Sequence, residues 1–326
     1  KRLLDVGEVQ KGTADRYDSD FKRFFENPNF PLADMEIRFI TEDILNQFMD
    51  VSIADFKLTS KTFSGLKLIL GLIFRYAKPQ YTDLSITNCL GDYQVPRKAL
   101  KNNKKKKTSD TENFTNREYS LLYRYLTDNK DIRNIGLLIG LETGLRVGEL
   151  SALKACDFNK KQLEDGSEVY LLSIRRTEKK YKNNEGKWVI SVEEMPKTEK
   201  SESDIVISKN VYELMLEAKA FNPNGEFLFM NVDNGNRIRS AYFNKRLKSV
   251  CKKIGIVPKS THKMRRYYAT SLHFSNAPDA FVADQMRHED ISTTRKSYIT
   301  DNADLLEKSI LMDNFSQYRK ELLRVC

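Results

Sequence analysis

The chain of 326 residues is poor in the side chains that cross-link proteins or hold metal ions. The four cysteines are Cys89, Cys156, Cys251 and Cys326. The length of the chain excludes a small disulfide-stapled protein. No two of the cysteines are close in sequence and no signal peptide precedes them, so we expect a reducing interior. Histidine is equally scarce, and no group of Asp, Glu and His has the spacing of metal ligands, which argues against a metal-dependent nuclease.

Long apolar runs are also missing. The most apolar stretch, Leu66–Phe74, is interrupted by Lys67 and followed by Arg75. A helix needs roughly 18 to 20 apolar residues to cross a bilayer. We therefore expect a soluble protein with no membrane partner.

Positive charge is what the chain has in excess. Lys and Arg number 55 against 45 Asp and Glu, which gives a formal net charge of +10 and an isoelectric point near 9.2. Such a balance suits a polyanionic partner, either nucleic acid or an acidic membrane surface. The length favours about two domains, each large enough for its own apolar core.

A basic segment divides the sequence. Residues Arg97–Lys107 read RKALKNNKKKK and are followed by a polar stretch, so we predict a linker over residues 97–114. Before it, apolar residues recur at helical spacing and Thr41 and Ser60 are expected helix starts, which predicts an all-helical domain over residues 1–96. The linker lysines could lie along phosphates.

A second domain is predicted over residues 115–326. Thr115 and Glu118 have the spacing of a capping box, which opens a helix through Tyr125. A buried helix over Ile135–Leu141 should end at Thr143-Gly144 and a short helix should resume at Val147, which puts Arg146 at a corner. A three-stranded antiparallel sheet is predicted from the strands Val169–Ile174, Trp188–Val192 and Asp204–Ile207.

Several short motifs follow one another in this second domain. They are TGLRVGEL at 143–150, EMPKTEK at 194–200, HKMR at 262–265, and His288 followed by ISTT at 291–294 and by Tyr298. His262 and Arg265 are three residues apart, so on a helix both would project from one face and could grip a small anion. Taken alone, each motif is weak, and a surface His beside a structural Arg would be the better explanation of HKMR.

In this order the motifs resemble the catalytic domain of the tyrosine recombinases, also called phage integrases. The resemblance covers Thr115 to about Leu311 and rests on five motifs in the family's order. It implies an α+β fold, with a mostly helical catalytic domain and a small antiparallel sheet, preceded by an all-α core-binding domain. It implies a site-specific DNA recombinase that needs no cofactor and no metal, cutting and rejoining strands through a 3′-phosphotyrosyl intermediate and a Holliday junction.

The resemblance also implies a role for each site residue. Tyr298 is the expected nucleophile. Arg146 and Arg265 would stabilise the negative charge that grows on the scissile phosphate. His262 is the better acid–base candidate and His288 the better phosphate donor, although the two roles could be exchanged, and Lys197 would protonate the leaving 5′ oxygen. Glu149 would orient its neighbours, and further expected DNA contacts are Lys104, Lys105, Lys106, Lys107, Lys179 and Lys180.

The chain departs from the family pattern next to His288. Members usually carry Leu-Gly before this histidine, whereas this chain has Met286-Arg287, which puts an extra positive charge near the site. The interval from His288 to Tyr298 is ten residues where many members have nine, and Arg266 stands where a second histidine is common. Tyr267 and Tyr268 are expected to pack within their helix.

Partners follow from the same resemblance. We expect double-stranded DNA attachment sites held by a clamp of the two domains, a homotetramer formed through a C-terminal helix, and accessory DNA-bending or excision proteins. Two amphipathic helices are predicted at Asp304–Ile310 and Phe315–Leu323; packing on their own domain is as compatible with the sequence as docking to a neighbour. The expected location is the bacterial cytoplasm, associated with the nucleoid.

Two other functions remain open at this point. A type IB topoisomerase shares the tyrosine, arginine, lysine and histidine chemistry but relaxes DNA without exchanging partners. A non-catalytic DNA-binding protein would need only the net charge and the lysine run. The lysine-rich composition and a first residue Lys1 rather than Met favour an integrase of a conjugative transposon or prophage, trimmed of an N-terminal arm-binding domain.

Overall fold

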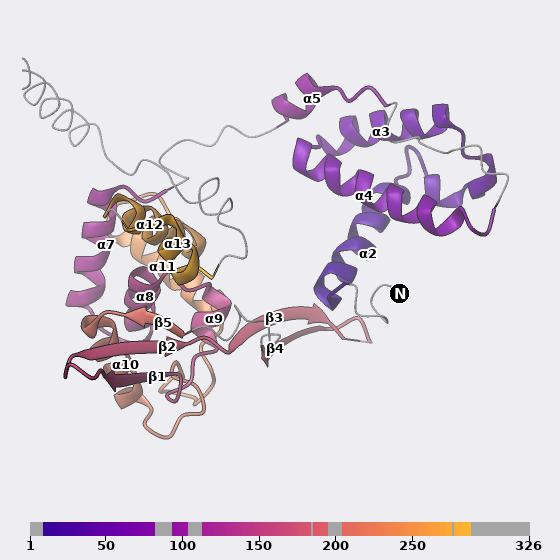
Figure 1. Cartoon of the computed structure of the whole chain (residues 1–326). Coiled ribbons are helices and arrows are strands. Elements are labelled where there is room, and N and C mark those ends of the chain that lie inside the picture. Colours follow the sequence, from indigo (N-terminus) through magenta and orange to yellow (C-terminus); the bar gives the residue numbers. More distant parts are fainter. Residues whose placement is uncertain are drawn as a thin grey trace, which may run out of the picture. The chain divides into compact units, whose positions relative to one another are not determined.

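The chain forms two units, each with its own core, in the computed structural model shown in Figure 1. The structure describes residues 9–81, 93–103, 113–183, 185–194, 204–275 and 277–287. The first unit comprises Lys1–Lys106 with Lys180–Val189, and the second comprises Lys107–Lys179 with Ile190–Cys326. Within the described ranges, no helix is long and apolar enough to cross a membrane.

Helices make the core of the first unit. They are α2 (Lys11–Phe25), α3 (Glu42–Phe56), α4 (Ser60–Ala77) and α5 (Arg97–Asn102), with short 3-10 turns at Leu32–Asp34 and Ile37–Phe39. The Thr41 hydroxyl accepts the backbone N–H of Ile44, which confirms the predicted start of α3. The predicted cap at Ser60 is wrong by one residue, because the Thr59 hydroxyl accepts from Thr62 and leaves Ser60 as the first helical residue.

Part of the segment predicted as a linker is helical. Helix α5 occupies its first six residues, and Leu100 on this helix is buried in the core of the first unit. The Asn103 side-chain amide donates to the carbonyl oxygen of Leu58 at 3.0 Å, which ties the end of α5 to the loop before α4. The lysine run at 104–107 lies outside the described residues.

The second unit is built around helix α8 (Ile132–Thr143), most of whose side chains are buried. Its helical neighbours are α7 (Asn116–Asp128), α9 (Val147–Ser151), α10 (Lys209–Phe221), α11 (Ser240–Lys253) and α12 (Thr261–Phe274), and α13 (Asp279–Gln285) packs against α12. The predicted capping box is confirmed, since Glu118 N–H donates to the Thr115 hydroxyl and Thr115 N–H donates to the Glu118 carboxylate. The predicted break after α8 is confirmed as well, because the helix ends at Thr143.

Two small antiparallel sheets complete the described strands. Strand β2 (Glu168–Ser173) is central in one sheet, between β1 (Phe158–Gln162) and β5 (Asp204–Ile207), and pairs Phe158 with Leu172. The other is a ribbon of β3 (Arg176–Lys182) and β4 (Trp188–Glu194). The predicted single sheet is therefore wrong in one strand: β4 pairs with β3, and the place predicted for it is taken by β1, whose polar residues gave no strand pattern.

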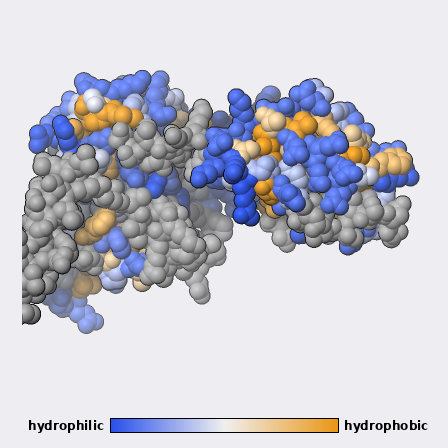
Figure 2. Space-filling model, turned by 90° about the horizontal axis from the view of Figure 1, so that it is seen from above, coloured by the Kyte–Doolittle hydropathy of each residue, from blue (hydrophilic) through white to orange (hydrophobic). Residues whose placement is uncertain are grey.

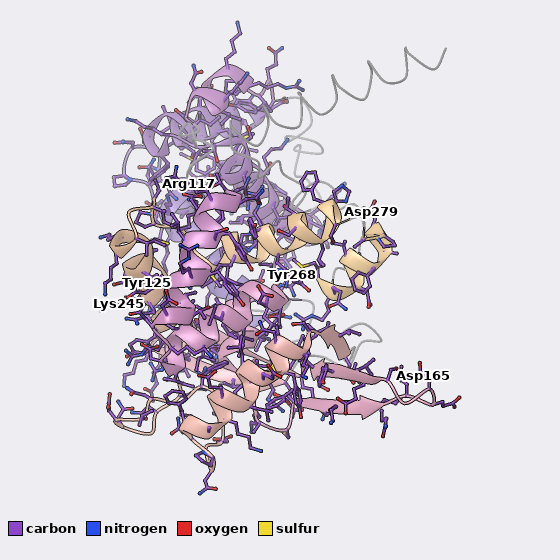
Figure 3. The ribbon with its side chains drawn as sticks, turned by 90° about the vertical axis from the view of Figure 1, so that its left-hand side faces the viewer. Arg117, Tyr125, Asp165, Lys245, Tyr268 and Asp279 are labelled. Atoms are coloured by element: carbon purple, nitrogen blue, oxygen red, sulfur yellow. The ribbon has the colours of Figure 1, made fainter. Side chains whose placement is uncertain are left out.

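The α+β class predicted for the chain is confirmed, with an all-α region before the catalytic motifs. In the second unit, Figure 1 shows the β1–β2–β5 sheet beside α10. Figure 3 places Asp165 at the tip of the β1–β2 turn and Tyr268 among the helices. Hydrophilic residues dominate the visible face of the described surface in Figure 2, and hydrophobic residues form separate patches there.

Candidate active site

The site begins at the corner between α8 and α9. The backbone there explains why Thr143 and Gly144 precede Arg146 in the TGLR sequence. The Thr143 hydroxyl donates back to the carbonyl oxygen of Ile139 at 2.6 Å, and Gly144 ends α8 with a φ of 62°. A Cβ atom on Gly144 would meet the Tyr268 ring at 2.4 Å. Both the left-handed backbone and the contact with the ring therefore require glycine.

Arg146 and Glu149 are joined at this corner. Arg146 is the residue before α9, and its backbone N–H and its Nη1 donate to the Glu149 carboxylate at 2.7 and 3.0 Å. The Arg146 side chain remains 49% exposed, whereas that of Glu149 is only 2% exposed. About half of the Arg146 side chain is thus open to a ligand, while the buried Glu149 carboxylate accepts from one of its guanidinium nitrogens.

The charge of Glu149 is stabilised by the arginines around it. Burial alone would raise the pKa of this carboxyl group, but Arg287, Arg146 and Arg265, together with the hydrogen bond from the Arg146 backbone, lower it below the usual range. Glu149 is therefore ionised at neutral pH and is held between Arg146 and Arg287. It is not poised to donate a proton.

Helix α12 brings the HKMR motif to the same place. Arg265 is buried, with Nη1 donating to the carbonyl oxygen of Gly144 at 2.7 Å and Nη2 donating to the carbonyl oxygen of Met286. Its guanidinium thus links the corner after α8 to the end of α13. The structure thereby groups Arg146, Glu149 and Arg265 although 119 residues separate the first from the last in the sequence.

His262 lies exposed on the first turn of α12. The pKa of the His262 imidazole is lowered below its ordinary value, first because the ring is partly shielded from water. The positive charges of its basic neighbours lower it further; they are Arg265, Lys263, Arg266 and Arg146. The neutral imidazole, which can accept a proton, is therefore the main form at neutral pH. This state suits the acid–base role expected of His262.

Arg287 is a member of this cluster to which the sequence analysis gave no role. It follows α13 with a φ of 49°, and its Nη2 donates to the Glu149 carboxylate. Its side chain is 5% exposed, so the Met286-Arg287 departure from the family pattern places a buried cation against Glu149. The extra charge was visible in the sequence, but its partner, 138 residues away, was not.

The two tyrosines of α12 have packing roles. Tyr267 stacks on Tyr119 with ring centroids 4.5 Å apart and donates its hydroxyl proton to Asn116 at 3.0 Å. Tyr268 covers Gly144, and its burial raises the pKa of the phenol to about 12. The Tyr268 phenol is therefore not prepared to ionise at neutral pH.

The hairpin lysines have local partners. Lys179 on β3 is 2.8 Å from the Glu193 carboxylate on β4, and Lys180 lies over the Trp188 ring, 4.7 Å from its centroid. Both side chains keep some exposure. The remaining predicted site residues, Lys197, His288, Tyr298 and Lys104 to Lys107, and the two C-terminal helices lie outside the described residues.

The described part of the site can bind an oxyanion. Arg146 is half-exposed and offers the N–H donors of its planar fork, and the neutral ring of His262 lies near it, whereas the buried Arg265 adds its positive charge from beneath. Preorganised donors of this kind stabilise the charge that develops on a phosphate during phosphoryl transfer. In the part of the chain that the structure covers, no three His, Cys, Asp or Glu side chains are grouped to hold one metal ion.

Known proteins resemble the chain in sequence and in fold. It is 23% identical over 304 residues to a tyrosine recombinase XerC-like protein of Caldanaerobacter subterraneus subsp. tengcongensis, covering 87% of this chain and 72% of that protein. Its fold is similar to that of the Tn1549 transposon integrase solved with circular intermediate DNA, with a TM-score of 0.68, 19% identity, and coverage of 96% and 97% of the two chains.

A second structural relative is a lambda integrase dimer bound to a core site, with a TM-score of 0.58, 16% identity, and coverage of 93% of this chain and 96% of that chain. The sequence also matches the model of the family described as "Phage integrase family" over residues 112–304, which is more than half of the chain. The chain therefore belongs to the phage integrase family and is a tyrosine-type site-specific DNA recombinase.

Proposed function

We propose that this recombinase integrates and excises a mobile genetic element by cutting and rejoining DNA at the element's ends. The observation that carries the proposal is the cluster of Arg146, Glu149 and Arg265, a preorganised phosphate site inside the family match. The fold resemblance to an integrase of the transposon Tn1549, solved with circular intermediate DNA, supports the choice of a mobile element.

The proposed reaction is a pair of transesterifications. The Tyr298 oxygen attacks the scissile phosphorus, the bond from phosphorus to the 5′ oxygen breaks, and the bond energy is kept in a 3′-phosphotyrosyl link. His262 takes the phenolic proton and Lys197 gives a proton to the departing 5′ oxygen. His288 donates to the phosphate, with the two histidine roles exchangeable. A 5′-hydroxyl of the partner duplex then reverses the step and produces a Holliday junction.

The assembly belongs to the proposal as well. We propose that four copies act on two duplexes and that the C-terminal helix of each docks to a neighbour. We also propose that accessory DNA-bending or excision proteins take part and that the protein acts in the cytoplasm, associated with the nucleoid. We propose that the chain has three functional parts: a core-binding domain (residues 1–96), a linker (97–114) and a catalytic domain (115–326).

The test is covalent trapping on the element's own DNA. The substrate is a labelled duplex from the joined ends of the element, nicked so that the 5′ fragment is lost after cleavage. We expect a covalent band on a denaturing gel with the wild type and none with Tyr298→Phe. Tyr267→Phe, which alters a packing tyrosine, should retain the band.

A band that survives in Tyr298→Phe would contradict the assignment of the nucleophile. A strand-exchange assay with two duplexes separates recombination from the relaxation expected of a type IB topoisomerase. Tight binding with no band from any variant would favour a non-catalytic DNA-binding role.

A further inference from the structure

We propose that Arg287 is a positioning residue of the recombination site, which shares the Glu149 carboxylate with Arg146 so that Arg146 keeps its positive charge available for the scissile phosphate. The inference rests on the proposed function and deepens it. It gives a role to a residue that stands where other family members usually have glycine.

The contacts divide one carboxylate between two cations. Oε1 of Glu149 accepts from Nη1 of Arg146, and Oε2 accepts from both the Arg146 backbone N–H and Nη2 of Arg287. Glu149 and Arg287 are 2% and 5% exposed, whereas Arg146 is 49% exposed. The buried pair therefore forms the floor of the site, and Arg146 is the member that a DNA phosphate can reach.

Arg287 occupies its place at a cost in stability. A φ of 49° puts a long side chain in the left-handed region that favours glycine. Its Nε and Nη1 are buried without a hydrogen-bond partner among the described residues, which adds a desolvation penalty. A glycine would avoid both penalties but would leave the buried Glu149 carboxylate with one cation fewer.

The Arg287 cation contributes to the charge of the cluster. Three guanidinium groups, those of Arg146, Arg265 and Arg287, and the single carboxylate of Glu149 leave two net positive charges. A phosphodiester carries one negative charge, and attack by a tyrosinate brings a second to the transition state. Without Arg287, the Glu149 carboxylate would neutralise Arg146, and the cluster would keep one net positive charge. The transition state carries two negative charges, so one of them would be left unbalanced.

The same region also links Arg287 to Arg265. The carbonyl oxygen of Met286, the residue before Arg287, accepts a hydrogen bond from Arg265 Nη2. The end of α13 therefore contacts both site arginines, one through its backbone and one through the Arg287 side chain and Glu149. Displacement of this segment should therefore disturb both Arg146 and Arg265.

A charge-restoring cycle tests the proposal. The rate of covalent complex formation is measured in single turnover on the nicked joined-end duplex for wild type, Arg287→Met, Arg287→Lys, Glu149→Gln and the double variant Arg287→Met/Glu149→Gln. We expect Arg287→Met to slow cleavage by about tenfold or more. Arg287→Lys, which keeps the charge, should lose less.

The double variant gives the decisive comparison. It restores two net positive charges, and the amide oxygen that replaces the carboxylate can still accept from Arg146, so we expect it to cleave faster than Arg287→Met. A double variant no faster than Arg287→Met would overturn the proposal, and so would Arg287→Met cleaving at the wild-type rate. A purely structural role of the pair predicts that the double variant recovers its unfolding temperature and its cleavage rate in parallel, whereas the proposal predicts a cleavage rate that follows the net charge at equal unfolding temperature.

The ion pair of Arg176 and Asp157, whose side chains are 14% and 2% exposed, supplies the control. The pair lies on β3 and the turn before β1. Arg176→Met and Asp157→Asn should couple in thermal unfolding but show no charge-specific rescue of cleavage. If the wild type forms no covalent complex on this DNA, the proposed function fails. The coupling of Arg287 with Glu149 is then measured by the unfolding temperatures of the same variants. Additive effects of the two single substitutions on the unfolding temperature would overturn the inference.

Discussion

Gly144 is the residue at which the local chemistry of the site is least tolerant of change. It combines a left-handed backbone with van der Waals contact to the Tyr268 ring, and its carbonyl oxygen accepts from Arg265. Gly144→Ala should lower the free energy of unfolding by more than the ~1–2 kcal/mol of a left-handed alanine, because the ring must also move.

Gly166→Ala is the matched control for this prediction. Gly166 has a φ of 80° but open space around the position of a Cβ atom. It should therefore show the backbone penalty alone, and differential scanning calorimetry of the two variants isolates the contribution of the contact. Equal shifts in the melting temperature would mean that Tyr268 does not restrict Gly144.

Glu149 makes the stability of the second unit depend on pH. Its pKa is lowered in the folded protein, so its contribution is present above the unfolded-state value of about 4.3 and is lost as the pH falls through the folded-state value. The melting temperature of wild type should exceed that of Glu149→Gln at pH 7, and the gap should narrow below about pH 4. A gap that is constant from about pH 7 to about pH 3 would contradict the lowered pKa.

At the scale of elements, Gly148 lets α9 and β3 approach. A Cβ atom on Gly148 would lie 2.8 Å from the Thr177 hydroxyl and 3.0 Å from the backbone carbonyl of Glu178. Glu178 is itself fixed, since it accepts from Arg237 at 2.6 Å and from the Ser240 hydroxyl at 2.6 Å. Because this backbone cannot yield easily, Gly148→Ala should destabilise the protein by ~1–3 kcal/mol and slow cleavage.

Gly140→Ala provides the comparison. Its added Cβ atom would meet the flexible ends of Met264 and Leu150 at 3.2 and 3.4 Å, inside a helix that favours alanine. Thermal unfolding and covalent trapping of both variants should therefore show a smaller loss for Gly140→Ala. An equal loss in both would argue that backbone contact at β3 is not the limiting feature.

Elements with strong local signals were predictable from the sequence. The capping box of α7 and the break between α8 and α9 depend on neighbouring residues, and both are present in the structure. Strand β1 carries Asn, Lys, Lys and Gln after Phe158, so only its backbone pairing with β2 reveals it. The Arg287–Glu149 contact joins the end of α13 to α9 and needs tertiary placement that no local pattern contains.

At the scale of the whole molecule, the net charge of +10 should govern DNA affinity. Each phosphate neutralised by the protein should contribute a slope of about −0.9 to the plot of log K against log salt. Fluorescence anisotropy with the joined-end duplex between about 50 and 200 mM salt measures that slope. A flat response would contradict binding dominated by phosphate contacts.

Replacing Lys104, Lys105, Lys106 and Lys107 by alanine tests the linker within the same titration. The slope should become shallower by about 0.9 for each lysine that contacts a phosphate. Alanine at Lys179 and Lys180 makes a second set from the hairpin. An unchanged slope in either set would remove those lysines from the DNA contacts.

The carboxylate of Glu118 serves two partners at once. It accepts from the Thr115 backbone at the start of α7, and it contacts the fully buried ammonium group of Lys259, two residues before α12. Opening the first turn of α7 would therefore leave that ammonium group without its counter-charge, so the two helix starts should open in a single step. Their amide protons should exchange with deuterium at matching rates, although 141 residues separate the two side chains in the sequence.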